Sequence, residues 1–137
     1  MVKDRAVAMI IDKKRILLIH RYKRGEHYYV FPGGSVKEGE IIEEACIREV
    51  KEETGLDVVD LKKMFEHIDE GRRGHYFLVH VTPGRPSLGG PELERQTSQN
   101  RHLPIWIPIE RLAEINLLPE GARRLCIEMI QSLPPAS

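Results

Sequence analysis

Short apolar runs separated by polar breaks fill the first part of the chain. Residues 5–12 and 15–21 are two runs rich in β-branched side chains, with a polar break at residues 12–14. This arrangement predicts a β-hairpin. Residues 28–31 form a third aromatic and β-branched run, which ends at Pro32-Gly33-Gly34. Because proline donates no backbone hydrogen bond and glycine accepts positive φ, we expect a sharp turn there.

Helical and strand patterns follow one another in the rest of the chain. Good helix formers occupy residues 41–54, and Gly55 follows as a C-terminal cap. Apolar runs predict strands at 58–68 and 76–81, with a turn between them, and a short edge strand at 104–109. A second helix is expected from Pro119 onward, because its apolar residues share one face: Ala122, Leu125, Cys126, Met129, Ile130 and Leu133.

The order of these elements predicts an α/β fold. Strands interleaved with two helices indicate a mixed sheet that is covered by helices on both faces. Residues 83–100 are rich in glycine, proline and mixed charges, which predicts a long irregular loop. Loops of that length in small domains are often functional, so this one is either a substrate lid or an insertion without a function.

Composition limits the size of the protein and the partners it can bind. The 137 residues, 41% of them apolar, fit a single domain over residues 1–137 with a real core. The 21 basic and 21 acidic residues balance, which argues against a dominant basic face that holds long nucleic acid. Any anionic ligand must therefore be bound by a local group of residues.

The cysteines and the apolar runs bear on the cellular setting. Cys46 and Cys126 lack a metal-type spacing, so we expect them to be small buried side chains in a reducing, cytoplasmic setting. The apolar run at residues 6–11 is too short to span a membrane and does not have the pattern of a secretory signal. No membrane association is expected.

Glu49, Glu52 and Glu53 lie within about one turn of the predicted helix 41–54. At about 100° per residue, the three carboxylates share one face, next to the apolar one. Like charges at this spacing repel, and carboxylate oxygens are ligands that suit Mg²⁺ or Mn²⁺. Such an ion would stabilise charge on a phosphoryl group and orient water. Taken alone, the spacing favours a solvated helix face that carries ion pairs such as Glu44–Arg48 over a metal site.

The residues around the glutamates distinguish these alternatives. Residues 34–56 match the Nudix box, Gly-x5-Glu-x7-Arg-Glu-U-x-Glu-Glu-x-Gly-U with U aliphatic, at every defined position: Gly34, Glu40, Arg48, Glu49, Val50, Glu52, Glu53, Gly55 and Leu56. Residues 29–34 and 106–112 resemble flanking segments of the same family. The chain therefore resembles Nudix hydrolases, which cleave nucleoside diphosphates linked to another moiety and use a divalent cation. The resemblance implies an α/β/α sandwich over the whole chain.

The matched positions carry the roles that the family implies. Glu49, Glu52 and Glu53 would be catalytic metal ligands. The turn at Gly33 and Gly34 would bring backbone groups close to the ion or the phosphates, and Gly33 would be the one of the two that contacts the metal. Arg48 would also serve catalysis by holding a carboxylate in orientation through a charge-assisted hydrogen bond, and Glu40 would support the metal ligands without binding the ion itself. Gly34 would likewise support the metal ligands without binding the ion itself.

The general base stays open between a glutamate of the helix and one of the loop at 83–100. Glu49 is the first candidate, and Glu92 or Glu94 in the loop at 83–100 is the alternative base or a further metal ligand. Proton abstraction requires hydrogen-bond reach to water, which the sequence does not measure.

Substrate contacts are expected from basic and aromatic side chains. A pyrophosphate carries more charge than one ion offsets, so six cations are candidates: Arg5, Arg21, Lys23, Arg24, Arg72 and Arg73. Arg21 is the best placed of them, because it ends the second run close to the glycine turn. Three tyrosines could stack on a base, and of Tyr22, Tyr28 and Tyr29 we take Tyr29 as the candidate.

The alternative to an enzyme is a Nudix-like sensor that binds a nucleotide sugar without cleaving it. A sensor would not need all three glutamates, so their presence favours the enzyme. ADP-ribose, oxidised deoxynucleoside triphosphates and dinucleoside polyphosphates all stay open as substrates. Family members frequently dimerise, so a homodimer is open as well.

Overall fold

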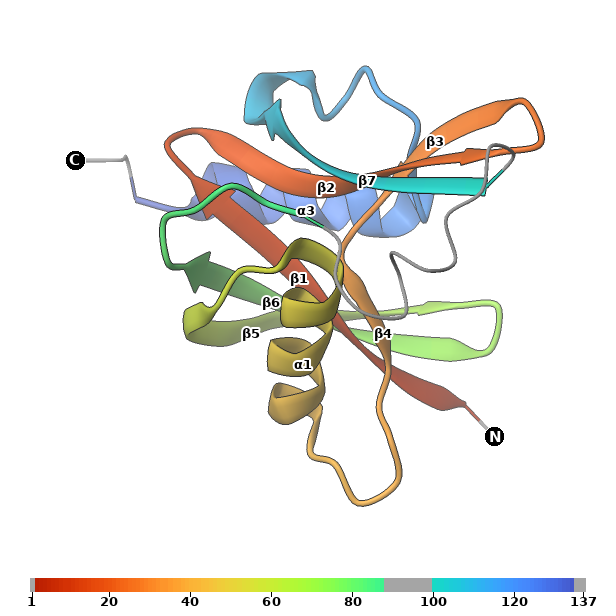
Figure 1. Cartoon of the computed structure of the whole chain (residues 1–137), viewed down its shortest axis with the longest axis vertical. Coiled ribbons are helices and arrows are strands. Elements are labelled where there is room, and N and C mark those ends of the chain that lie inside the picture. Colours follow the sequence, from red (N-terminus) through yellow and green to blue (C-terminus); the bar gives the residue numbers. More distant parts are fainter. Residues whose placement is uncertain (1, 88–99, 135–137) are drawn as a thin grey trace.

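The structure is a computed structural model that describes residues 2–87 and 100–134 (Figure 1). The elements follow one another as β1 (Lys3–Asp12), β2 (Arg15–Lys23), β3 (Glu26–Val30), β4 (Gly33–Ser35), α1 (Ile42–Thr54), β5 (Val58–Asp69), β6 (Arg72–Val81), β7 (Asn100–Pro108), the 3₁₀ turn η1 (Ile109–Arg111), β8 (Leu117–Leu118) and α3 (Glu120–Ser132).

All the described strands belong to one mixed sheet. Hydrogen-bonded neighbours follow the order β5-β6-β1-β2-β3-β8, with β4 also beside β1 and β7 also beside β2. β1 runs parallel to β6, and β3 runs parallel to β8, whereas the other pairs are antiparallel. The helices α1 and α3 lie on opposite faces of this curled sheet (Figure 1). The predicted α/β sandwich with a mixed sheet is confirmed.

Side-chain alternation along β1 supplies apolar residues to both helix layers. One core cluster joins the sheet to α1 and includes Ala6, Ala8, Ile10, Ala45, Cys46 and Val50. The other joins the sheet to α3 and includes Val7, Met9, Leu18, Ala122, Cys126 and Met129. Because β1 is buried on both faces, its sequence reads as one continuous apolar run. Both cysteines are buried, as predicted, and burial raises the pKa of each thiol to about 12.

The chain changes sheet partners at the Pro32-Gly33 step. β3 pairs with β2, whereas β4 pairs with β1, where Gly33 lies opposite Val7. A Cβ atom on Gly33 would lie 2.9 Å from the Cα atom of Val7, so only glycine allows this close approach of two backbones. The carbonyl oxygen of Pro32 accepts the N–H of Ala8 at 2.8 Å, which fixes the crossing. The sharp turn predicted at residues 32–34 is the point at which the chain changes its partner strand from β2 to β1.

Some elements differ from the sequence prediction. The last long strand begins at Asn100 and pairs with the whole length of β2, so it is longer than the short edge strand expected at 104–109. The short strands β4 and β8 carry too little pattern to predict, because each depends on a partner distant in sequence. Most of the predicted loop at 83–100 lies outside the described residues. Neither described helix is long and apolar enough to cross a membrane.

The sheet–α3 core makes a stability prediction. Leu18 is fully buried in it, whereas Leu103 on the neighbouring strand β7 is 57% exposed. We expect Leu18→Ala to lower the free energy of unfolding by about 3 kcal/mol, since it removes buried methyl groups and leaves a cavity. The matched change Leu103→Ala should cost about 0.5 kcal/mol or less. Urea unfolding followed by circular dichroism measures both, and equal losses would contradict the described core.

Candidate active site

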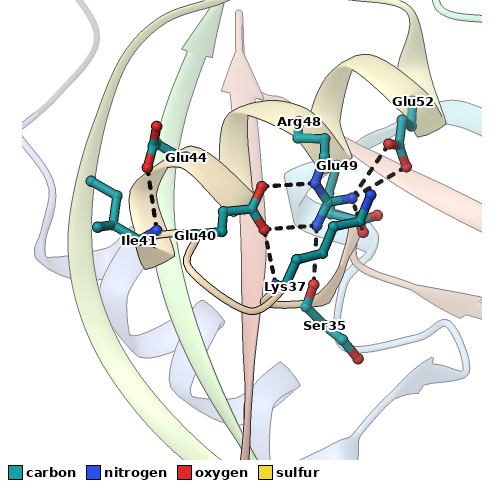
Figure 2. A network of polar contacts seen from close by, with 8 residues as sticks. All are labelled: Ser35, Lys37, Glu40, Ile41, Glu44, Arg48, Glu49 and Glu52. Carbon is teal, nitrogen blue, oxygen red and sulfur yellow. Dashed lines mark hydrogen bonds and ion pairs between the residues drawn. The ribbon is translucent and has the colours of Figure 1, made fainter.

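Arg48 is the centre of a polar network on α1 (Figure 2). Its guanidinium donates to both carboxylate oxygens of Glu40, from Nε at 2.9 Å and from Nη2 at 3.1 Å. Nη1 donates to Glu49 at 2.8 Å and to Glu52 at 3.3 Å. Nη2 also donates to the carbonyl oxygen of Ser35 at 3.0 Å. One cation therefore holds three carboxylates and ties α1 to β4.

The segment before α1 presents Glu40 to this network. Glu40 also accepts the backbone N–H of Lys37 at 3.0 Å, which holds the loop in place. The hydrogen bond from Arg48, followed by that from Lys37, lowers the pKa of Glu40 to about 2. The same contact with Glu40 is the main reason that the pKa of Arg48 is raised. The Arg48 and Glu40 side chains are only 21% and 16% exposed, so their pair is better shielded than an ordinary surface pair.

The glycine turn lies directly against two of the glutamates. The N–H of Gly33 donates to Glu53 Oε1 at 3.0 Å. A Cβ atom on Gly34 would lie 2.6 Å from the carboxylate carbon of Glu49, so the absence of a side chain makes room for that carboxylate. The close approach of backbone and carboxylates at this turn is the geometry that the two glycines permit.

A cleft of about 1240 Å³ opens in front of this turn. Glu49, Glu53, Gly33 and Gly34 line it together with the basic side chains Arg5, Arg21, Lys23, Arg24 and Arg72. Acidic oxygens and several cations therefore face the same space. This lining would suit a polyphosphate ligand, because carboxylates can bind its cation and arginines can bind its phosphates.

Comparison with known proteins identifies the family of this chain. The model of the NUDIX domain matches residues 2–126. The chain belongs to the NUDIX family. Members of this family generally use divalent metal ions such as Mg²⁺ or Mn²⁺.

Two relatives illustrate the similarity in sequence. An ADP-ribose pyrophosphatase of Methanocaldococcus jannaschii is 37% identical over 107 residues, which are 72% of this chain and 63% of that protein. The chain thus spans less than two thirds of the length of this relative. An RNA pyrophosphohydrolase of Aeromonas hydrophila is 29% identical over 123 residues, which are 72% of this chain and 67% of that protein.

Solved structures show the same fold. A MutT NUDIX hydrolase from Burkholderia pseudomallei aligns over 95% of this chain and 98% of its own, with a TM-score of 0.71 and 25% identity. A NUDIX family hydrolase from Clostridium perfringens aligns over 98% and 99%, with a TM-score of 0.72 and 20% identity. The Nudix-type α/β/α sandwich that the sequence resemblance implied is confirmed.

The Nudix box residues fall into two connected groups in the structure. Arg48 gathers Glu40, Glu49 and Glu52, whereas Glu53 is held by the turn. Glu52, with a side chain 34% exposed, is not among the described residues that line the cleft. Within residues 2–87 and 100–134, no three Asp, Glu, His or Cys side chains converge as a ready-made metal site. In this arrangement Arg48 binds the carboxylates of Glu40, Glu49 and Glu52, and the Gly33 N–H donates to the carboxylate of Glu53.

The predicted substrate contacts are only partly brought together. Arg21 and four of the other basic candidates line the cleft, but Arg73 pairs with Glu66 at 3.6 Å outside it. Tyr29 is not one of the described cleft residues, because its ring packs on the α3-side core and lies 4.8 Å from the ring of His20. Glu92 and Glu94 lie outside the described residues.

Sequence reasoning weighed Tyr28 without choosing it and missed His102 as a cleft residue. Strand alternation provides a signal for the tyrosine, since Tyr28 and Tyr29 must point to opposite faces and Tyr28 pairs directly with Arg21. His102 lies opposite Arg21 on β7, and this neighbour becomes visible only once the β2–β7 register is known.

The Glu40–Arg48 pair predicts a pH-dependent stability. A folded-state pKa of about 2, below the ordinary value of 4.5, stabilises the fold above pH 4.5, and that contribution is lost as the pH falls toward 2. We therefore expect Glu40→Gln to lower the melting temperature at pH 7. The deficit relative to the unsubstituted protein should shrink between pH 4.5 and pH 2.

Melting curves recorded by circular dichroism at closely spaced pH values check this expectation. Glu38→Gln is the control, since Glu38 is an exposed residue of the same loop and belongs to none of these contacts. A melting-temperature deficit of Glu40→Gln that stays constant down to pH 2 would refute the role of this ion pair.

Proposed function

We propose that this Nudix hydrolase cleaves a phosphoanhydride bond in a nucleoside diphosphate linked to another moiety, with Mg²⁺ or Mn²⁺ as its cofactor. The observation that carries the proposal is the joint lining of one cleft by Glu49, Glu53, the glycine turn and five cations. The names of the relatives from Methanocaldococcus jannaschii and Aeromonas hydrophila, both pyrophosphate-cleaving enzymes, also support it.

The donor atoms at the turn fit a hard divalent cation. Glu49, Glu52 and Glu53 offer carboxylate oxygens from about one turn of one helix, and the backbone of Gly33 lies against them through its N–H bond to Glu53. Oxygen ligands of this kind are those that Mg²⁺ and Mn²⁺ take, usually together with waters and phosphate oxygens. When bound, the ion would stabilise the charge on the phosphoryl group and lower the pKa of a bound water.

The residues of the chain position the reacting groups. Arg48 holds Glu49 and Glu52 through Nη1, which restricts their orientation and offsets the repulsion between them. Gly34 leaves the space in which the Glu49 carboxylate lies. The cations of the cleft other than Arg21 then bind the phosphate oxygens and hold the anhydride in front of the carboxylates.

We assign the proton transfer to Glu49, which faces the cleft and lies beside the turn. A carboxylate there can accept a proton from the attacking water when that water lies within hydrogen-bond reach. Glu92 stays the alternative base.

Three other expectations from the sequence stay predictions. They are the single domain over residues 1–137, the homodimer and the cytoplasmic setting.

The roles of the glutamates make a direct prediction about activity. With Mg²⁺ and a panel of ADP-ribose, dinucleoside polyphosphates and oxidised deoxynucleoside triphosphates, we expect Glu52→Gln and Glu53→Gln each to lower kcat roughly 100-fold or more. The control is Glu43→Gln, which changes an exposed glutamate of the same helix. Product is measured by chromatography.

Two results would contradict the proposal. Unchanged turnover in Glu52→Gln and Glu53→Gln would remove these glutamates from catalysis. Tight nucleotide binding by the unsubstituted protein, with no product from any member of the panel, would instead indicate the Nudix-like sensor.

A further inference from the structure

Three side chains form a row across the strands at the floor of the cleft. Tyr28 on β3 pairs with Arg21 on β2, and Arg21 pairs on its other side with His102 on β7. Directly paired residues project from the same face of a sheet, and all three line the cleft that also contains Glu49 and Glu53. The row therefore belongs to the space in front of the proposed reaction centre.

Arg21 and Arg5, both half-buried in the cleft, have no described carboxylate partner. The other half-buried arginines of the described chain pair with acidic residues: Arg15 with Asp12, Arg48 with Glu40, Arg73 with Glu66 and Arg123 with Glu120. No described carboxylate pairs with Arg21, its Nε is enclosed without a hydrogen-bond acceptor, and its guanidinium lies 5.6 Å from the centre of the Tyr28 ring. A shielded donor without an acceptor costs free energy, which a ligand that brings acceptors would recover.

His102 limits the kind of ligand that this row accepts. Burial, and then the positive charge of Arg21, lowers the pKa of His102, so its imidazole is neutral near pH 7. One cation, one aromatic ring and one neutral imidazole suit a planar, uncharged group with hydrogen-bond acceptors, such as a nucleobase.

The row lies at a suitable distance from the carboxylates. Gly33 follows Tyr28 by five positions along the chain, which corresponds to at most about 17 Å of extended backbone. A nucleotide whose phosphates lie at the glycine turn would extend its base in this direction within one cleft.

We propose that Arg21, Tyr28 and His102 recognise the base of the substrate, and that they favour a 6-oxopurine over adenine. The planar fork of arginine donors matches the adjacent acceptors O6 and N7 of guanine, whereas adenine presents a donor beside its N7 acceptor. Tyr28 supplies the flat surface beside the arginine. The assignment rests on the proposed function, since it takes the ligand to be a nucleoside diphosphate derivative.

Binding of non-hydrolysable analogues tests the row independently of turnover. The probes are the α,β-methylene analogues of GDP and ADP, with methylenediphosphonate as the base-free probe, all titrated calorimetrically with Mg²⁺ present. We expect the unsubstituted protein to bind the GDP analogue at least tenfold more tightly, a difference of about 1.4 kcal/mol. Arg21→Met should abolish this preference, and Arg101→Met, an exposed charge-matched change next to His102, should keep it.

Three results would overturn the assignment. The first is equal affinity of the unsubstituted protein for the two nucleoside analogues. The second is an equal loss of affinity for all three probes in Arg21→Met, which would make Arg21 a phosphate contact. The third result is used if Arg21→Met does not fold. Tyr28→Leu is then expected to weaken the binding of both nucleoside analogues relative to the binding of methylenediphosphonate. If Tyr28→Leu leaves these relative affinities unchanged, the role of the row is refuted.

Failure of this row can be told apart from failure of the proposed function. A base preference that depends on Arg21, found without turnover of any diphosphate substrate, would support the row and contradict the hydrolase proposal. Turnover that is lost in Glu52→Gln, but with no base preference in binding, would contradict the row alone.

Discussion

The contact of one guanidinium with three carboxylates is the interaction on which the site depends. Arg48 joins Glu40, which precedes the helix, to Glu49 and Glu52 on the helix itself, and through the Ser35 carbonyl it also binds β4. Without that charge, glutamates three and four residues apart on one helix face would repel one another. The network keeps acidic groups close together while no ligand has yet compensated them, and it aligns the helix with the glycine turn.

The backbone provides the second condition for the site. Gly33 lets β4 pass close to β1, and Gly34 leaves room for the carboxylate of Glu49. The turn lies where the chain leaves β2 as a partner and pairs with β1, so the cleft faces residues from both parts of the sheet. A substrate in this cleft would contact the carboxylates at the turn and the side chains of β2, β3 and β7 farther along.

Sequence predicts the local features of this structure well and the long-range ones poorly. The spacing of residues 41–54 determines which glutamates share a helix face, and the Nudix box marks both Glu40 and Arg48 without pairing them. In the structure Arg48 pairs with Glu40, whereas Glu44 accepts the N–H of Ile41, so the Glu44–Arg48 pair does not form. Tyr29 differs from Tyr28 only in the face of the sheet to which it points. The place of His102 next to Arg21 depends on a strand pairing between segments some eighty residues apart, which no local pattern encodes.

The most direct measurement of the central claim is anomalous scattering from a crystal grown with Mn²⁺ and the α,β-methylene analogue of GDP. The account predicts a manganese peak bound by carboxylate oxygens of Glu49, Glu52 and Glu53 next to Gly33, with the diphosphate beside it. No peak at this turn, with the three carboxylates still bound as described to Arg48 and to the N–H of Gly33, would contradict it.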